Sequence, residues 1–358
     1  MSGPLSGYRI IEMGGIGPGP FAGMMLADSG AEVIRIDRPD TKFGPESTML
    51  RSRKLVVLDL KDPADVDQLR ALVKSADALY EGFRPGTMER LGLGPDILLA
   101  DNPRLVYGRM TGWGQTGPLA PFAGHDLNYI ALAGAAHSIG TAATPIPAPP
   151  FIGDMGGGGM LLAFAITSAL LHAERTGQGQ VIDCAMSEGA ALLMTMIYGM
   201  YATQAWIPER EANLLDGGAP FYRAYRTADG KFISIAAIEP QFYAELIRRL
   251  GLDAETELSR QMDRVRWPVL RERFEEIFAR KTQAEWCALL EQSDACFAPI
   301  LDMSEAPLHP HNVMRQNFIE LDGVHQPAPS PRYSVTGLDH PALPSQTTVA
   351  ELLEERPT

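Results

Sequence analysis

The residues best suited to chemistry stand in two short segments. His125 lies in the run Gly124-His125-Asp126, among small and polar residues, and Asp154 stands just ahead of four consecutive glycines at 156–159. A glycine-rich turn that opens a helix leaves backbone N–H groups free, and these groups can stabilise an oxyanion. The segments therefore predict a proton-transfer site in which an imidazole and a carboxyl group flank one carbon. A loop hydrogen bond for His125 and a helix N-cap for Asp154 are the plainer alternatives.

Composition limits the classes of protein to which the chain can belong. Its 358 residues carry a net charge of −13, which argues against nucleic acid as the main partner because phosphate binding needs a basic face. Three cysteines are too few for a disulfide framework. The N-terminal segment lacks the charged and apolar regions of a signal peptide, and the apolar run at 160–171 is shorter than a membrane span. We expect a cytoplasmic protein without a membrane partner.

The first half of the chain alternates strands and helices. The expected elements are a strand at 8–13, a Gly/Pro turn at 14–20, a helix at 21–29, strands at 31–37 and 55–60, a helix at 66–75, and strands at 78–81 and 105–110. Strands that alternate with helices run parallel in a sheet. The pattern therefore predicts an α/β fold with a doubly wound parallel sheet over about the first 185 residues.

Beyond this region the pattern changes. A long apolar helix is expected at 186–201, and a loop with strong turn chemistry at 213–220. Ala228-Asp229-Gly230 between two short strand patterns predicts a hairpin. Helices expected at 240–250, 267–281 and 282–292 complete a smaller α+β domain. The proline-rich tail is expected to run extended over a surface.

The turn at 17–22 matches the pattern G-x-G-x-x-A of dinucleotide-binding proteins, and Asp37 follows it at the expected distance. Pro18 and Pro20 remove backbone donors where a pyrophosphate would need them. We therefore interpret the segment as a tight turn and not as a nicotinamide dinucleotide site. A different nucleotide ligand stays open.

Cations follow several of the predicted strands. They are Arg38, Lys61, Arg84 and Arg90. Segments after strands gather at the carboxyl edge of a doubly wound sheet, where ligands bind. Together these cations would neutralise a nucleotide that bears a 3′-phosphate and a pyrophosphate, although each alone is compatible with a solvated surface charge.

These motifs give the chain a resemblance to a known family. It resembles the α-methylacyl-CoA racemases of the family III CoA-transferase superfamily over nearly its whole length. The matching stretches are residues 12–20, 33–39, 82–93, 109–115, 124–129, 153–158, 179–183, 214–221 and 237–243. The tail from about residue 317 matches poorly and supports no inference.

The resemblance implies a fold of two domains. A large Rossmann-like domain that binds coenzyme A would be joined by two linkers to a smaller α+β domain, and two chains would interlock as a homodimer. The boundaries expected on this basis are 1–185 for the large domain, completed by about 325–358, then 186–219 for a linker helix and loop, 220–312 for the small domain and 313–324 for the return linker.

The resemblance also implies the substrate and its binding residues. Coenzyme A would be bound as part of the substrate thioester, with no separate cofactor and no metal. The expected binding residues are Ile16, Arg38, Leu58, Asp59, Leu60, Lys61, Gly82, Phe83, Arg84, Arg90, Gly124, Asp126, Leu127, Asn128 and Tyr129.

The reaction implied by the resemblance is inversion at C2 of a 2-methylacyl-CoA, by a 1,1-proton transfer through an enolate. His125 would take the proton of the (S)-substrate and Asp154 that of the (R)-substrate. Glu239 would orient His125 from the partner chain, with Tyr129 as a second candidate partner of the ring. The active site would then lie at the dimer interface.

A stripe of methionines at helical spacing has two interpretations. Met194, Met196 and Met200 are typical of a core face. By the resemblance, they would instead join Met155 and Met186 in a soft surface along which the acyl group moves.

Three other functions fit parts of the pattern. A CoA-transferase of the same superfamily would use Asp154 as a nucleophile that forms a mixed anhydride, and it would not need His125. A non-catalytic acyl-CoA-binding protein would need neither residue. A nicotinamide oxidoreductase would need the dinucleotide site disfavoured above. The presence of His125 with Glu239 favours the racemase.

Overall fold

The computed structural model describes residues 2–42 and 45–355, which fall into two units. Unit 1 comprises Met1–Ala135, Ala148–Met194 and Gln316–Thr358, and unit 2 comprises Ala136–Pro147 and Thr195–Arg315. The division differs from the predicted domains at three places. Residues 136–147 belong to unit 2. The predicted linker 186–219 is shared between the units, and so is the predicted return linker 313–324, in which the boundary between the units follows Arg315.

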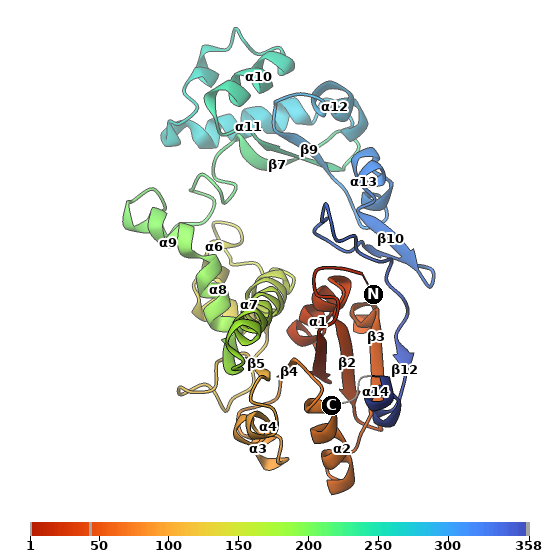
Figure 1. Ribbon diagram of the computed structural model, residues 1–358. Coiled ribbons are helices and arrows are strands. Elements are labelled where there is room, and N and C mark those ends of the chain that lie inside the picture. Colours follow the sequence, from red (N-terminus) through yellow and green to blue (C-terminus); the bar gives the residue numbers. More distant parts are fainter. Residues whose placement is uncertain (1, 43–44, 356–358) are drawn as a thin grey trace. The chain divides into compact units, whose positions relative to one another are not determined.

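Unit 1 is built on a seven-stranded parallel sheet (Figure 1). Its order is β12-β3-β2-β1-β4-β5-β6, with β10 and β11 pairing separately as a hairpin. The strands are β1 (Arg9–Met13), β2 (Glu32–Asp37), β3 (Arg53–Val57), β4 (Ala78–Glu81), β5 (Val106–Thr111), β6 (Gln180–Ala185), β10 (Phe318–Leu321), β11 (Val324–Pro327) and β12 (Ser345–Gln346). The chain first adds strands on one side of β1 and then returns to its other side with β4, which confirms the predicted doubly wound α/β fold.

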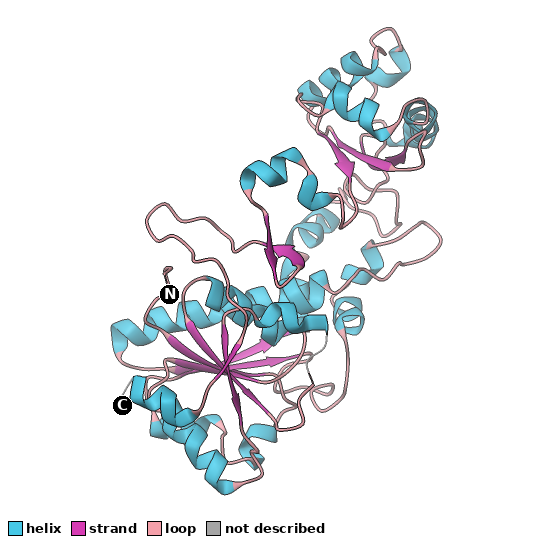
Figure 2. Ribbon diagram, turned by 90° about the vertical axis from the view of Figure 1, so that its right-hand side faces the viewer, coloured by secondary structure: helices cyan, strands magenta, loops and turns pink. Residues whose placement is uncertain are grey.

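Helices cover both faces of this sheet (Figure 2). Those within or bordering unit 1 are η1 (Pro45–Leu50), α1 (Pro18–Asp28), α2 (Pro63–Val73), α3 (Thr87–Arg90), α4 (Pro95–Asp101), α5 (Asp126–Leu132), α6 (Ala135–Ser138), α7 (Leu161–Thr176), α8 (Met186–Leu193) and α14 (Val349–Glu355). In β1, Ile10 packs in the core under α1 and α7, whereas Ile11 packs in the core under α2, α4 and α14. Neighbouring residues of a strand face opposite cores because their side chains alternate across the sheet.

The helix around the predicted proton-transfer carboxylate begins earlier than expected. A π-helix, η2 (Phe151–Met160), contains Asp154 and all four glycines and continues directly into α7. The prediction of an open glycine-rich turn was therefore wrong. Residues 157–159 are buried where η2 packs against α1 and α8, and a Cβ atom at any of them would clash there. Close packing outweighs the low helix propensity of glycine.

η2 and α7 together span Phe151–Thr176, and these 26 residues are long and apolar enough to cross a membrane by length and composition alone. The sequence analysis counted only the apolar run at 160–171, which is shorter than a membrane span. The helix is longer than this run because it begins at Phe151. Core helices of globular domains pass the same test. Leu162, Ile166 and Leu170 of α7 lie in the core that unit 1 forms beneath α1.

Three further segments differ from their predictions. β3 ends at Val57, so residues 58–61 follow the strand where the prediction placed a strand at 55–60. The expected helix 186–201 is interrupted at Met194, between α8 and α9 (Thr195–Ala202). The tail is not wholly extended, because it forms the hairpin β10–β11, the edge strand β12 and the helix α14.

Unit 2 has an α+β structure around an antiparallel sheet of order β7-β8-β9. Its elements are β7 (Tyr222–Arg226), β8 (Phe232–Ala236), α10 (Pro240–Leu250), η3 (Thr256–Ser259), η4 (Arg264–Arg266), α11 (Trp267–Phe278), α12 (Gln283–Leu290), β9 (Phe297–Ile300), η5 (Ala306–Leu308) and α13 (Pro310–Arg315), besides α9. The predicted hairpin joins β7 to β8. Aromatic rings fill the core, where Tyr225 lies 5.1 Å from Phe278 between ring centroids.

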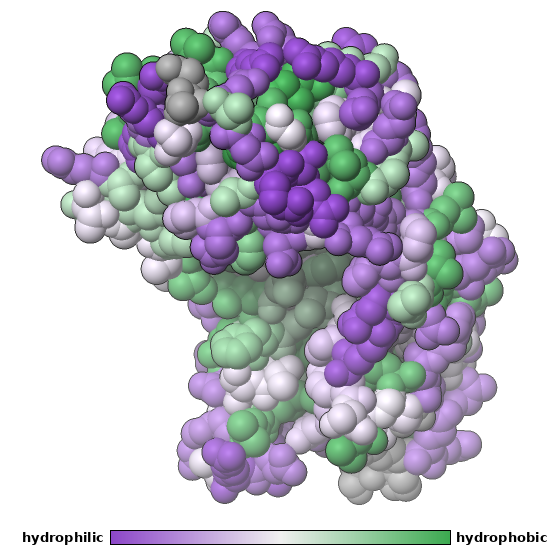
Figure 3. Space-filling model, turned by 90° about the horizontal axis from the view of Figure 1, so that it is seen from above, coloured by the Kyte–Doolittle hydropathy of each residue, from purple (hydrophilic) through white to green (hydrophobic). Residues whose placement is uncertain are grey.

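Apolar side chains also reach the surface. Figure 3 shows one face of the molecule, on which hydrophilic residues predominate and hydrophobic residues form small patches between them. In unit 1, large apolar side chains are exposed along η2, α7 and α8, among them Phe151, Phe164 and Leu192. Apolar surface of this kind is available for association with another molecule.

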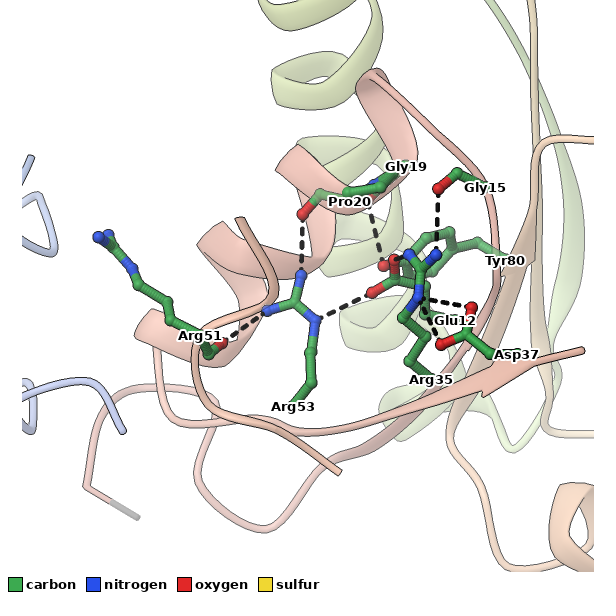
Figure 4. A network of polar contacts seen from close by, with 9 residues as sticks. All are labelled: Glu12, Gly15, Gly19, Pro20, Arg35, Asp37, Arg51, Arg53 and Tyr80. Atoms are coloured by element: carbon green, nitrogen blue, oxygen red, sulfur yellow. Dashed lines mark hydrogen bonds and ion pairs between the residues drawn. The ribbon is translucent and has the colours of Figure 1, made fainter. Parts of the chain in front are cut away.

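A buried network of charges lies beneath the loop between β1 and α1 (Figure 4). Glu12, at 0% exposure, forms ion pairs with Arg35 at 2.6 Å and with Arg53 at 2.9 Å. Arg35 also contacts Asp37 at 3.0 Å, so that two cations and two carboxylates balance one another. A buried charge without a partner is costly, and each member of the network therefore depends on the others.

The same network fixes the backbone around it. Arg35 donates to the Gly15 carbonyl at 3.1 Å, Arg53 donates to the Pro20 carbonyl at 2.8 Å, and the Tyr80 hydroxyl donates to the Gly19 carbonyl at 3.2 Å. The loop after β1 and the first turn of α1 are therefore held from below by side chains of β2, β3 and β4.

Glu12→Gln tests this network. The substitution keeps the side chain's size but leaves two buried guanidinium groups without their shared carboxylate, so we expect a loss of about 3–5 kcal/mol in the free energy of unfolding. Urea-induced unfolding followed by circular dichroism measures it. Asp101→Asn, which removes the partly exposed partner of Arg70, is the control in the same unit and should cost far less. Equal small losses for both variants would contradict a dependence of the loop on Glu12.

Candidate active site

The two residues predicted to transfer protons, His125 and Asp154, line one cavity of about 440 Å³ in unit 1. A second cavity, of about 560 Å³, is lined by segments that follow β1, β2 and β3. Four residues line both cavities: Met13, Gly15, Ile16 and Phe83. The cavities therefore adjoin. After the roles that the sequence analysis predicts for their residues, we call them the catalytic cavity and the nucleotide cavity.

Topology explains why both cavities form here. β1 and β4 are neighbours in the sheet, but the chain leaves them on opposite sides of the switch in strand order. Their loops therefore diverge and leave a crevice at the carboxyl ends of the strands. Residues 14–17 after β1 and residues 82–84 after β4 form its walls.

The nucleotide cavity gathers seven of the fifteen residues that the sequence predicted for coenzyme A. Those that line it are Ile16, Arg38, Leu58, Asp59, Leu60, Lys61 and Phe83. Lys42 lines it too and was missed, although it follows the same strand as Arg38 and the same rule would have found it. Of the charged groups that line this cavity, Arg35 and Asp37 are paired with each other, and Arg38 contacts Asp40 only loosely, at 3.7 Å.

The remaining predicted binding residues lie elsewhere. Gly82, Arg84, Gly124 and Tyr129 line the catalytic cavity. Arg90 lines neither cavity and donates to the Thr87 hydroxyl at 2.9 Å. Leu127, Asn128 and Asp126 line neither cavity, and they belong to the first turn of α5 behind His125.

His125 is held by its backbone at the start of α5. Its N–H donates to the Asn128 side chain at 3.0 Å, and its carbonyl accepts the Asn128 N–H at 2.8 Å. The imidazole is exposed into the catalytic cavity. The Tyr129 hydroxyl donates to the Gly124 carbonyl and not to the imidazole, so Tyr129 does not serve as the predicted second partner of the ring.

Tyr129 instead supports the loop that carries His125. Its ring meets Trp113 edge to face, with centroids 4.8 Å apart. A Cβ atom on Gly124 would come within 2.7 Å of the Tyr129 ring, and one on Gly112 would clash with it. Two glycines thus make room for the tyrosine beneath the histidine loop. Burial raises the pKa of Tyr129 to about 12, so the hydroxyl stays protonated as a donor.

Asp154 projects into the same cavity from η2. Its N–H donates to Asp126 Oδ2 at 2.7 Å. Gly17, at a φ of 67°, leaves room for the carboxyl group, because a Cβ atom there would lie 3.2 Å from Asp154 Oδ2. Burial raises the pKa of Asp154 to about 6, the Asp126 carboxylate adds to this rise, and His125 opposes it. A carboxyl group with this pKa exchanges its proton near neutral pH.

The oxyanion cradle predicted at residues 154–157 is not free. The N–H of Asp154 is bound by Asp126, and the N–H of Met155 donates to the Pro150 carbonyl at 3.1 Å. Because the helix begins at Phe151, the N–H groups of residues 155–157 lie inside it, and that of Asp154, in its first turn, is capped by the Asp126 side chain. This prediction is corrected accordingly.

Comparison with known proteins identifies the family. A model of CoA-transferase family III matches residues 5–349. The chain belongs to this family. An α-methylacyl-CoA racemase from Mus musculus is 45% identical over 342 residues, which cover 95% of this chain and 88% of the mouse protein. An acetyl-CoA:oxalate CoA-transferase from Acetobacter aceti is 30% identical, over 95% of this chain and 91% of its own length.

A solved structure has the same fold. A CAIB/BAIF family protein from Brucella suis superposes with a TM-score of 0.85 at 24% sequence identity, and the match covers 99% of this chain and 100% of that chain. The resemblance to CoA-transferase family III and the α/β fold expected from it are both confirmed, and the expected homodimer stays a prediction.

Two groups of residues assigned through the family resemblance remain to be placed. Glu239 is exposed in unit 2, immediately before α10, so its role toward His125 stays a prediction. Met186 is buried and lines the catalytic cavity, whereas Met196 is exposed on α9. The part of the chain that the structure describes contains no group of three His, Cys, Asp or Glu side chains able to hold a metal ion.

Proposed function

We propose that this member of CoA-transferase family III inverts C2 of 2-methylacyl-CoA thioesters. The observation that carries the proposal is the presence of His125 and Asp154 in one cavity that adjoins a second cavity lined with cations. The 45% identity to the mouse α-methylacyl-CoA racemase supports it. Coenzyme A enters as part of the thioester, without a separate cofactor.

The chemistry needs two groups that exchange roles. His125 takes the C2 proton of the (S)-substrate, an enolate forms, and Asp154 returns a proton to the opposite face; the (R)-substrate reverses the order. One group must carry a proton while the other carries none, so the protonation states of the two groups are coupled. The raised pKa of Asp154, about 6 because of burial, keeps both forms of its carboxyl group accessible near neutrality.

The substrate's nucleotide end fits the nucleotide cavity. Arg38, Lys42 and Lys61 line it and would neutralise the 3′-phosphate and pyrophosphate of coenzyme A. Arg84 lines the catalytic cavity near the shared residue Phe83, on the path that the pantetheine arm would take to the thioester. Charge on the phosphates therefore anchors the molecule while the acyl group reaches His125 and Asp154.

Alanine variants of the cations test this placement. Arg38→Ala and Lys61→Ala should each weaken the binding of free coenzyme A by about fivefold to tenfold, because each removes a charge-assisted contact to a phosphate. Isothermal titration calorimetry measures the dissociation constants. Arg104→Ala, which removes an exposed cation that precedes β5 at the other edge of the sheet, should leave them unchanged. Equal effects of all three would mean that only overall charge matters.

A CoA-transferase is the second candidate, because the family contains such enzymes. By the family resemblance, Asp154 would then be the nucleophile. A carboxylate that forms a mixed anhydride does not need a second proton-handling group. His125, which faces the same cavity as Asp154, favours the racemase.

Incubation with (S)-2-methylacyl-CoA in D₂O separates the two candidates. We expect deuterium at C2 together with the (R)-epimer, both followed by NMR, and a loss of both by more than about a hundredfold in His125→Ala, because that variant lacks one proton-transfer group. A parallel sample contains an acceptor carboxylic acid. Transfer of CoA to that acid without exchange at C2, undiminished in His125→Ala, would establish the transferase instead.

We also propose that the enzyme acts as an interlocked homodimer in which Glu239 of one chain orients His125 of the other. The exposed apolar side chains of η2, α7 and α8 in unit 1 support self-association, since a soluble chain rarely leaves such groups uncovered. The exposure of Glu239 leaves its carboxylate available to a second chain.

Mixed dimers test the shared site. His125→Ala and Glu239→Ala chains, each nearly inactive alone, should recover about one quarter of wild-type activity when refolded together in equal amounts, because half of the dimers are mixed and one of their two sites is intact. The exchange of deuterium at C2 is the readout, and each variant refolded alone is the control. If no activity returns although mixed dimers form, Glu239 acts within its own chain or not at all.

A further inference from the structure

Asp126 is a buried carboxylate between the two groups of the proposed proton transfer. It follows His125 directly in the sequence, is only 7% exposed, and its Oδ2 accepts the N–H of Asp154 at 2.7 Å. Within the described part of the chain, its Oδ1 has no hydrogen-bond partner. A buried carboxylate that is only half satisfied is costly, so its presence here calls for a function.

The surrounding backbone is shaped to admit this carboxylate. Gly153 lies so close that a Cβ atom there would stand 2.7 Å from Asp126 Oδ2. A side chain at this position would push the carboxylate away from the Asp154 N–H. Gly153 and Asp154 of η2 thus contact Asp126 of α5, although the two segments lie 28 positions apart in the sequence.

We propose that Asp126 is a positioning residue, which fixes the backbone of Asp154 and whose buried negative charge favours the protonated form of the Asp154 carboxyl group. Its catalytic consequence rests on the proposed function. Its effect on Asp154 does not, because that effect arises from charge and geometry alone.

The electrostatics of the site agree with this role. The pKa of Asp154 is raised first by burial and next by the charge of Asp126, while His125 lowers it. The pKa of Tyr129 is likewise raised by burial and then by Asp154 and Asp126. The helices packed against η2 carry other charged or titratable groups, which are Glu188 of α8 and His172, Glu174 and Arg175 of α7, all exposed, and Asp28 of α1, which is paired with Arg51. Arg84 lines the same cavity as Asp154. Asp126 is therefore the buried negative charge that acts on Asp154.

The sign of the effect on catalysis follows. A negative charge beside Asp154 disfavours its ionised form, so Asp126 raises the lower of the two apparent pKa values of the His125–Asp154 pair. Activity with either epimer requires the pair to hold a single proton. Removal of the charge of Asp126 should therefore extend activity toward lower pH, and by the same amount for both epimers, since the overall equilibrium constant fixes their ratio.

Asp126→Asn tests the proposal, because the amide oxygen can still accept the Asp154 N–H while the charge is lost. Carbon-13 NMR of protein labelled at its aspartate carboxyl carbons follows the titration of Asp154, assigned by the loss of its signal in Asp154→Asn. We expect the pKa of Asp154 to fall by about one unit in Asp126→Asn. The acidic limb of the pH profile of kcat/KM should move down by a similar amount.

Two further variants separate charge from structure. Asp183→Asn removes a carboxylate that also accepts a backbone N–H, that of Gln115, and it should leave the Asp154 titration unchanged. Gly153→Ala keeps the charge of Asp126 but displaces it, and it should lower the pKa of Asp154 in the same direction. Gly153→Ala also keeps the proposal testable if Asp126→Asn does not fold.

The outcomes are distinct. An Asp154 pKa that is unchanged in Asp126→Asn overturns the proposal, and so does a loss of activity with no shift of the acidic limb, because a purely structural role would produce that result. A fall in the Asp154 pKa in a protein that exchanges no deuterium at C2 would uphold the proposal while the proposed racemase function failed.

Discussion

The structure depends on the neutralisation of charge beneath the loop that follows β1. Glu12, the penultimate residue of the buried strand β1, balances Arg35 and Arg53, and Arg35 in turn donates to the Gly15 carbonyl. Gly15 and Ile16 belong to the wall common to the catalytic and nucleotide cavities. If this loop shifted, both cavities would change together. The cavity proposed to bind the nucleotide and the cavity that holds the proposed proton-transfer groups thus share a wall that is supported by the same buried ions.

The catalytic cavity shows a second use of buried charge. Asp154 and Asp126 come from different elements, η2 and α5, and meet through a backbone hydrogen bond where close packing is made possible by Gly153. Glu12 lies between cations, which stabilise its charge, whereas Asp154 lies beside a carboxylate, and burial together with that neighbouring charge raises the pKa of Asp154. The same low-dielectric interior therefore supports the loop in one place and tunes a carboxyl group in the other, according to the sign of the neighbouring charge.

Much of the fold and part of the candidate site could be predicted from the sequence, for physical reasons. The βαβ pattern fixed the parallel sheet, and the rule that ligands bind after strands located Arg38 and Lys61 at the nucleotide cavity. The start of η2 could not be read, because four glycines signal a turn unless neighbouring helices pack against them. The Glu12 network could not be read either. Sequence patterns do not reveal which charged residues of a strand are buried together, since that depends on pairing between β1, β2 and β3.

The position of Asp154 in an unbroken helix has a consequence for the chemistry. An aspartate in an open turn could adapt its backbone to the substrate, but the N–H of Asp154 is fixed by Asp126 and the buried glycines after it are locked against α1 and α8. The backbone that carries its carboxyl group is therefore fixed, and under the proposed mechanism the acyl group would have to move between the two proton-transfer groups. His125 stands at the start of the short helix α5, which also supplies Asp126, so a displacement of that helix would alter the position of the imidazole and the surroundings of the Asp154 carboxyl group at once. The two groups proposed to transfer protons are therefore coupled through the fold.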